Sequence, residues 1–136
     1  MAAGYSGTPL VKKLGIKPGI KALIVDEPKA YFDWINPLPD GTKFLKKAPT
    51  GQVEFIHLFV TTLKDFSKQF KDGKKILAKD GMMWISWPKK SSGMATDLDE
   101  NIIRDFGLKN GLVDVKVCAV DETWSGLKFM FRVKDR

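Results

Sequence analysis

Apolar and polar residues follow two different periods along this chain, and the change of period predicts its elements. Short apolar runs bounded by turn residues are typical of strands buried on both faces, whereas apolar residues three and four positions apart are typical of helices packed on one side. Strand-like patterns occupy residues 21–26, 42–47, 52–61, 82–87, 112–120 and 127–134. Helix-like patterns occupy residues 8–15, 28–35, 62–77 and 97–110.

Capping residues mark the predicted ends of two of these helices. Thr8 is expected to cap the first helix, with Pro9 in its first turn and Gly15 at its end. Asp97 followed by Glu100 forms a capping-box pattern for the last helix. Turns are predicted at residues 39–41, 80–81 and 121–126.

The order of these elements predicts the fold class. Strands alternate with helices until a final pair of strands, which indicates an α/β, three-layer Rossmann-like domain with a mostly parallel sheet and a C-terminal antiparallel hairpin. This order of elements resembles that of a shortened class I methyltransferase. The resemblance implies that the weak strand 42–47 lies at one edge and the hairpin at the other, with strands 21–26, 52–61 and 82–87 in that order between them. A single domain spans residues 1–136, in which residues 1–19 form an N-terminal capping segment and a short helix. The role of residues 4–7 stays open.

The chain is basic, with a formal net charge of +7, but its lysines are dispersed as separate pairs. Without an arginine-rich tract or interleaved aromatic residues, this pattern disfavours nucleic acid as a partner and permits a small anionic ligand or an acidic protein. Cys118 is the only cysteine, so no internal disulfide is possible. Because no apolar run could span a membrane and no signal peptide is recognisable, we expect a cytoplasmic protein without membrane contact.

The segment Gly81–Gly93, GMMWISWPKKSSG, contains the strongest sign of a ligand site. A buried strand ends there in lysines and serines, which can offer charges, hydroxyl groups and backbone donors to a phosphate or carboxylate. In an open α/β sheet, ligands bind at the carboxyl ends of parallel strands, near the reversal of the strand order. We place that reversal between strands 21–26 and 52–61. The residues expected to bind a ligand are Asp26, Thr61, Trp87, Lys89, Lys90, Ser91, Ser92 and Trp124.

No set of residues predicts catalysis or metal binding. His57 lies in the middle of strand 52–61, where a hydrogen-bonded core histidine is expected, and Cys118 is expected to pack as a small apolar residue. One histidine and one cysteine do not form a known metal-ligand set with the scattered acids. Trp87 and Trp124 can either stack on a ligand ring or form a hydrophobic lid. We therefore predict no catalytic residue, no metal and no resident cofactor.

The order of elements resembles a shortened class I methyltransferase. Those enzymes have a glycine-rich loop after the first strand, where residues 26–30 of this chain read DEPKA. They also have an acidic residue at the end of the next strand, where this chain has Lys46 and Lys47. The resemblance therefore implies the fold without the usual site for S-adenosylmethionine.

Longer motifs resemble the DUF3052 family, a group of uncharacterised bacterial proteins. This resemblance covers nearly the whole chain and rests on residues 4–19, 57–61, 86–90, 96–98 and 111–129. The family has no assigned activity, so the resemblance implies a fold and no function.

The sequence favours a non-catalytic module that binds a small anion or a partner on a degenerate methyltransferase-like fold. Two alternatives stay open. The first is a divergent transferase that uses a nucleotide-like cofactor, with Asp26, Asp97 or Asp121 as its base. The second is a weak nucleic-acid binder. The identity of the ligand, the partner and the oligomeric state are left undecided.

Overall fold

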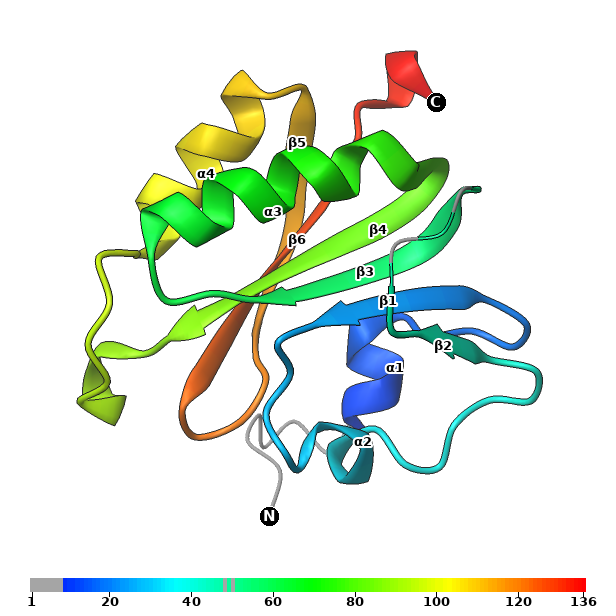
Figure 1. Cartoon of the computed structure of the whole chain (residues 1–136), viewed down its shortest axis with the longest axis horizontal. Coiled ribbons are helices and arrows are strands. Elements are labelled where there is room, and N and C mark those ends of the chain that lie inside the picture. Colours follow the sequence, from blue (N-terminus) through cyan, green and yellow to red (C-terminus); the bar gives the residue numbers. More distant parts are fainter. Residues whose placement is uncertain (1–8, 48, 50) are drawn as a thin grey trace.

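The computed structural model describes residues 9–47, 49 and 51–136, which form a six-stranded sheet with helices on both faces (Figure 1). Thr8 and residues 4–7 lie outside the described residues. The predicted cap at Thr8 is wrong, because Pro9 is the N-cap of the first helix and its carbonyl oxygen accepts the first helical N–H groups. The strands are β1 (Lys21–Val25), β2 (Lys43–Leu45), β3 (Val53–Phe59), β4 (Leu77–Pro88), β5 (Leu112–Ala119) and β6 (Trp124–Phe131). The helices are α1 (Leu10–Leu14), α2 (Tyr31–Trp34), α3 (Leu63–Ile76) and α4 (Glu100–Lys109), with short 3-10 turns η1 (Lys90–Ser92) and η2 (Val133–Asp135). Within these ranges, no helix combines the length and the apolar character needed to cross a membrane.

The strands lie in the order β2-β1-β3-β4-β6-β5. The expected order of the first four strands and the position of the hairpin at the far edge are confirmed, while the structure decides that β6 is the hairpin strand beside β4. β1 pairs in parallel with β2 and β3, and β3 pairs in parallel with β4. β6 is antiparallel to both β4 and β5, so the C-terminal hairpin forms the edge opposite β2. The predicted α/β, Rossmann-like fold class is confirmed. The strand order reverses between β1 and β3, where a ligand edge is expected.

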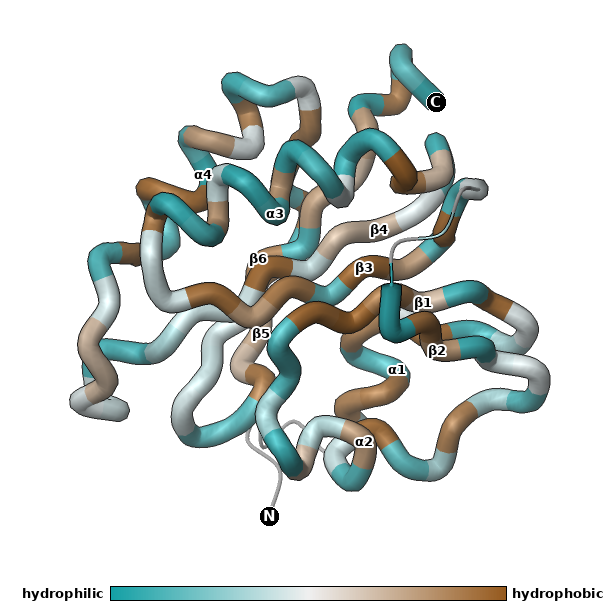
Figure 2. Tube along the Cα trace, in the orientation of Figure 1, coloured by the Kyte–Doolittle hydropathy of each residue, from teal (hydrophilic) through white to brown (hydrophobic). Residues whose placement is uncertain are grey.

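The helices form one layer on each face of the sheet (Figure 1). On one face, Phe66 and Phe70 of α3 and Ile103 of α4 are buried against the strands. On the other face, Leu14 of α1 and Tyr31 of α2 are buried. Figure 2 shows strongly hydrophobic stretches along β1 and β3, between the two layers. The sheet therefore has a hydrophobic core on each face.

The second helix is shorter than predicted. It forms a single turn, Tyr31–Trp34, instead of residues 28–35. The Pro28 carbonyl oxygen accepts the Tyr31 N–H at 3.0 Å, so residues 28–31 form a turn before the helix begins. Ala30, at the N-cap, has no side chain that can cap the helix.

The last helix begins at Glu100, so the predicted capping box from Asp97 is wrong. Asp99 is the N-cap, and its Oδ1 accepts an N–H from the first turn at 2.8 Å. Asp97 Oδ1 instead accepts the N–H of Leu63, the first residue of α3, at 2.7 Å. The chain turns inward at Leu98, which is buried in the core, and this turn delays the start of the helix.

β4 begins at Leu77, so the turn predicted at residues 80–81 is wrong as a boundary and is a bulge inside the strand. Residues 78–81 of β4 face only Glu54 of β3. A Cβ at Gly81 would lie 2.9 Å from the Glu54 carbonyl oxygen, so this close approach requires glycine.

β6 also begins earlier than predicted, at Trp124 instead of residue 127. Asp121 Oδ1 accepts the N–H groups of Thr123 and Trp124 at 2.9 and 2.7 Å. This side chain closes a tight turn, which lets pairing with β4 and β5 start at once.

The packing of α4 on β6 gives a stability prediction. A Cβ added at Gly107 would overlap the Phe129 ring. We predict that Gly107→Ala lowers the free energy of unfolding by about 1–3 kcal/mol in chemical denaturation, because overpacking exceeds the helix preference of alanine. Asp105→Ala, at an exposed position of the same helix, should stay within about 0.5 kcal/mol of the wild type. Equal stability of Gly107→Ala and wild type would contradict the packing.

Candidate functional site

The backbone makes a left-handed turn at Asp26, which follows β1 at the reversal of the strand order. Its φ is 58°, and it is the one non-glycine residue with a positive φ among those that the structure describes. Aspartate and asparagine tolerate this region better than most residues, although it costs about 1 kcal/mol. The sequence has no glycine in residues 26–30, yet the chain adopts here a conformation that usually favours glycine.

The side chain of Gln69 connects this turn to α3. Its Nε2 donates to Oδ2 of Asp26 at 3.2 Å. Its Oε1 is buried and accepts no hydrogen bond, although buried polar atoms in proteins normally have a partner. Gln69 also lines a cavity under α3. Its Oε1 is therefore a buried acceptor without a protein partner, on a side chain that borders the cavity.

Two adjoining cavities flank the end of β1. One, of about 310 Å³, lies between the ends of β1 and β2, and its lining includes Val25, Asp26, Glu27, Phe32, Phe44 and Lys46. The other, of about 200 Å³, lies between α3 and the strands, and its lining includes Val25, Lys46, Leu58, Gln69, Asp72 and Gly73. The two cavities lie on opposite faces of the sheet, and Val25 and Lys46 line both of them at the end of β1. We call this pair of cavities the β1 cleft.

The β1 cleft has two carboxylates on one side, an aromatic wall and a lysine on the other side. Asp26 and Glu27 place exposed carboxylates after β1. Phe32 packs edge-on against Phe44, with ring centroids 5.0 Å apart. Lys46 lies exposed after β2. This arrangement fits a ring that carries a donor-rich or cationic group on one side and an anionic group on the other.

The basic segment after β4 is mostly engaged within the protein. Lys89 Nζ donates to the Asp121 carbonyl oxygen at 2.8 Å and so fastens this segment to the β5–β6 turn. Ser92 Oγ donates to the Lys89 carbonyl oxygen at 2.6 Å. Lys90 and Ser91 are exposed. Two of the four predicted anion-binding residues therefore already have structural roles.

The predicted residues Trp87, Trp124 and Thr61 also take part in packing or loop contacts. Trp87 is buried in the core on the α3 face. Trp124 packs edge-on against Phe59, with ring centroids 5.1 Å apart. The Thr61 carbonyl oxygen accepts from Thr96 Oγ1 at 2.6 Å, which holds the β4–α4 connection against the end of β3.

The cavity beside Lys89 and Lys90, of about 350 Å³, has carboxylates in its wall. Asp99 and Glu100 line it together with the two lysines. Carboxylates in the wall of the cavity weaken the electrostatic attraction of the two lysines for an anion. Anion binding by the Gly81–Gly93 segment stays a prediction.

Sequence reasoning misses Gln69, Phe32 and Phe44. Gln69 had a recognisable signal, since it lies three positions after Phe66 on the side of α3 that packs on the sheet. A polar residue on such an apolar face is a candidate for a specific contact. The two phenylalanines had no such signal, because only the turn at residues 28–31 brings α2 beside β2.

His57 is a satisfied core residue, as the sequence predicts. It is fully buried, and its Nδ1 and Nε2 hydrogen-bond with the hydroxyl groups of Tyr31 at 2.9 Å and Ser86 at 2.7 Å. A neutral imidazole has one donor and one acceptor nitrogen, so one hydroxyl donates to the ring and the other accepts. Burial lowers the pKa of His57 from 6.5 to about 3, so the ring is neutral at physiological pH.

Cys118 is half-buried in β5, and burial raises its pKa, so its thiol form is favoured. Across the ranges that the structure describes, no three His, Cys, Asp or Glu residues are grouped so that they could hold a metal ion.

No family model matches the chain, and no curated protein sequence matches it. Membership of the DUF3052 family therefore stays a prediction based on motifs. Solved structures match the fold. A SAM-dependent methyltransferase from Thiobacillus denitrificans, in complex with S-adenosyl-L-homocysteine, aligns with a TM-score of 0.63 and 10% identity over 90% of this chain and 89% of the enzyme.

Two further methyltransferase structures align in the same way. The N-methyltransferase NodS from Bradyrhizobium japonicum WM9 has a TM-score of 0.62 and 9% identity over 88% of this chain and 90% of its own. A SAM-dependent methyltransferase from Aquifex aeolicus has a TM-score of 0.57 and 16% identity over 90% of this chain and 88% of its own. At these identities the likeness defines the class of fold: a Rossmann-like domain of the methyltransferase type.

The left-handed turn at Asp26 can be tested with two variants that both remove its carboxylate. We predict that Asp26→Gly is more stable than Asp26→Ala by about 1 kcal/mol, because alanine has a Cβ and cannot make the local hydrogen bonds that help aspartate in this region. Urea denaturation of both proteins measures the difference. If the two variants are equally stable, the backbone at residue 26 is not constrained as described.

The buried His57 predicts a pH dependence of stability. Its folded pKa of about 3 lies below the unfolded value of 6.5, so between these values the unfolded state binds the extra proton. The free energy of unfolding should therefore fall by up to about 1.4 kcal/mol per pH unit as the pH drops below 6.5. Denaturation between pH 5 and pH 6.5, a conservative window chosen above most carboxyl pKa values, measures this loss.

His57→Gln is the matched control for this prediction. Glutamine offers both a donor and an acceptor to Tyr31 and Ser86 but does not titrate. The variant should lose this component of the pH dependence, whatever its absolute stability. A wild-type slope that survives in His57→Gln would assign the effect to another group.

Proposed function

We propose that this protein is a divergent transferase that binds a nucleotide-like cofactor in the β1 cleft. The observation that carries the proposal is the buried Oε1 of Gln69, an acceptor without a partner beside the reversal of the strand order. The left-handed turn at Asp26 and the methyltransferase-type fold support it. The non-catalytic anion-binding module has less support, because Lys89 and Ser92 are engaged within the fold.

The residues of the cleft fit a nucleoside. Phe32 and Phe44 offer an apolar wall for a base, and Gln69 Oε1 can accept from an exocyclic amino group or a ribose hydroxyl. Asp26 and Glu27 attract a cationic or hydroxyl-bearing group. S-adenosylmethionine, when bound, would supply a methyl group activated by a positively charged sulfur. These carboxylates can attract that charge.

Lys46, which lines the cleft, restricts the class of cofactor that can bind there. A carboxylate after the second strand accepts from ribose hydroxyls, which Lys46 cannot do because an ammonium group has no acceptor. A cation at this position instead suits a phosphate or carboxylate on the ribose side. We therefore favour a nucleotide that carries an anionic group near Lys46. S-adenosylmethionine, whose ribose carries no anionic group, is the compound to compare with it.

Of the three acids expected as a base, Asp26 has the most support. Asp97 accepts the Leu63 N–H and Asp121 accepts two N–H groups of its own turn. Asp26 lines the cleft and is exposed. It is the residue that we propose to take a proton from the acceptor substrate, while Gln69 orients it.

Calorimetry tests the proposal with S-adenosylmethionine, S-adenosylhomocysteine, ATP and NADP⁺, each at up to about 1 mM, a concentration at which weak but specific sites are occupied. We expect at least one of them to bind. Gln69→Leu and Asp26→Asn should weaken that binding about tenfold, the loss of one hydrogen bond or charge contact. Absence of binding by all four compounds would overturn the proposal.

The double variant Lys89→Ala, Lys90→Ala is the control that separates the two functional hypotheses. It should leave the binding of the nucleotide unchanged, because neither lysine lines the β1 cleft. If it abolishes binding while Gln69→Leu does not, the ligand binds after β4, and the anion-binding module is the correct interpretation.

A further inference from the structure

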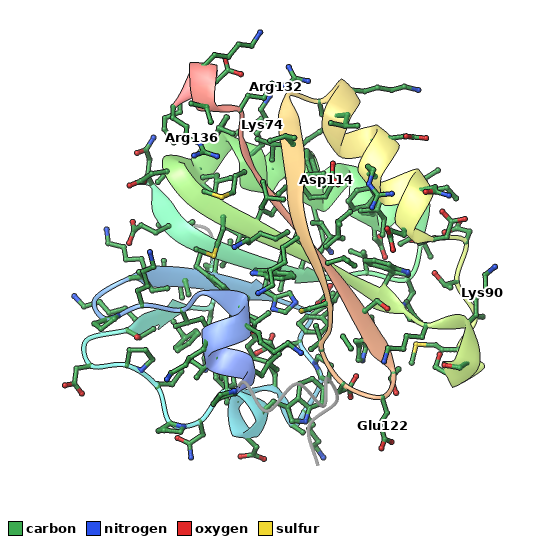
Figure 3. The ribbon with its side chains drawn as sticks, turned by 180° about the vertical axis from the view of Figure 1, so that it is seen from behind. Lys74, Lys90, Asp114, Glu122, Arg132 and Arg136 are labelled. Atoms are coloured by element: carbon green, nitrogen blue, oxygen red, sulfur yellow. The ribbon has the colours of Figure 1, made fainter. Side chains whose placement is uncertain are left out.

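The end of the molecule opposite the ligand edge gathers much of its positive charge. Figure 3 shows Lys74, Arg132 and Arg136 together at this end, whereas Glu122 of the β5–β6 turn lies at the other. The cations come from the C-terminal parts of α3 and α4, the start of β4 and the segment after β6. We call this surface the basic end; its cations are Lys71, Lys74, Lys75, Lys79, Lys109, Arg132, Lys134 and Arg136.

Few carboxylates balance these cations. Asp80 and Asp135 are the acids in the same segments, while Asp72 pairs with Lys68 at 3.4 Å and lines the β1 cleft. Asp114, which Figure 3 shows near Lys74, pairs with Arg104 at 2.9 Å. Among the residues that the structure describes, none of the eight cations forms a salt bridge. The basic end is therefore a region of net positive potential.

A groove of about 450 Å³ runs through the basic end. Its lining is Lys71, Lys74, Lys75, Lys79, Asn110 and Phe131, with no carboxylate. Lys79 Nζ lies 4.2 Å from the centre of the Phe131 ring and covers it. The groove therefore presents ammonium groups to solvent above an apolar floor.

Hydrogen bonds to backbone carbonyl oxygens hold three of the cations in place. Lys74 Nζ donates to the Asn110 oxygen at 2.6 Å, and Arg132 Nη2 donates to the Leu108 oxygen at 3.1 Å. Arg136 Nε donates to the Phe131 oxygen at 2.9 Å. These bonds bring the end of α4 and the C-terminal segment up to the groove, so the charges form a fixed, extended surface.

We propose that the basic end binds the phosphate backbone of a nucleic-acid duplex. Cations spread over four separate segments match a row of phosphates better than one small anion, which needs donors that converge on a point. Lysine acts as a point charge on phosphate and gives little base recognition. Phe131, the aromatic residue in the described lining of the groove, is 5% exposed and offers no ring face for stacking, so single strands are disfavoured. Binding is independent of base sequence and of the cofactor.

Fluorescence anisotropy with a labelled 20-base-pair duplex, as DNA and as RNA, tests this proposal between about 50 and 200 mM salt. The full chain should bind at least one duplex at low salt, with a logarithmic affinity that falls linearly with the logarithm of salt. Lys71, Lys75 and Lys79→Gln together should weaken binding at least about tenfold and make the salt slope shallower by about 2–3.

A matched triple variant controls for net charge. Lys12, Lys43 and Lys64→Gln removes the same charge from exposed positions outside the basic end and should change the affinity less than about twofold. Circular dichroism checks the fold of both variants.

Three results would overturn the proposal. They are no duplex binding at 50 mM salt, an equal loss in both triple variants, and tighter binding of inorganic polyphosphate or anionic vesicles than of either duplex. A nucleotide that binds the β1 cleft would not affect any of them.

Discussion

β3 has no solvent-exposed face, and its burial determines how the other elements are arranged. Phe55, Ile56 and Leu58 are at most 1% exposed, although their side chains alternate between the two faces of the sheet. Such a strand is stable only with a strand on each side and a helical layer above and below. β1 and β4 are the strands that pair with β3 on its two sides, while α3 with α4 and α1 with α2 form the two helical layers. The three-layer fold follows from this requirement.

Because β3 is buried on both faces, its one histidine needs hydrogen-bond partners inside the core. His57 lies on β3, and its hydrogen bonds with Tyr31 and Ser86 connect α2, β3 and β4. Because an unpaired buried ring nitrogen is costly, these bonds help to hold the one-turn helix α2 against the sheet. The position of α2 in turn places Phe32 beside Phe44 and so forms the wall of the β1 cleft. The core network and the candidate site are thus physically connected.

Much of the site could be located in advance, but its chemistry could not. The order of strands and helices, through its resemblance to a methyltransferase, was enough to predict where the strand order reverses, and hence that Asp26 lies at a ligand edge. The pairing of Asp26 with Gln69 joins residues far apart in the chain, and the left-handed turn depends on how β1 enters the loop. The lysines after β4 had the stronger local pattern, yet the fold uses Lys89 to hold a turn. Local composition does not show which polar groups will form hydrogen bonds within the protein and so be unavailable to a ligand.

Hydropathy periods were sufficient for the α/β class and the buried role of His57, because local periodicity determines which faces of an element are apolar. The order of the first four strands was implied by the resemblance to a methyltransferase. Helix ends and strand bounds needed the tertiary structure, since Asp97 accepts the first N–H group of α3 instead of capping the helix that follows it in sequence. The distribution of charge needed it most. Cations from three separate stretches, residues 71–79, 109 and 132–136, meet at the basic end, because the ends of α3, α4 and β6 and the start of β4 lie at one end of the sheet. Electrostatic potential depends on distance in space, and only the folded chain determines those distances.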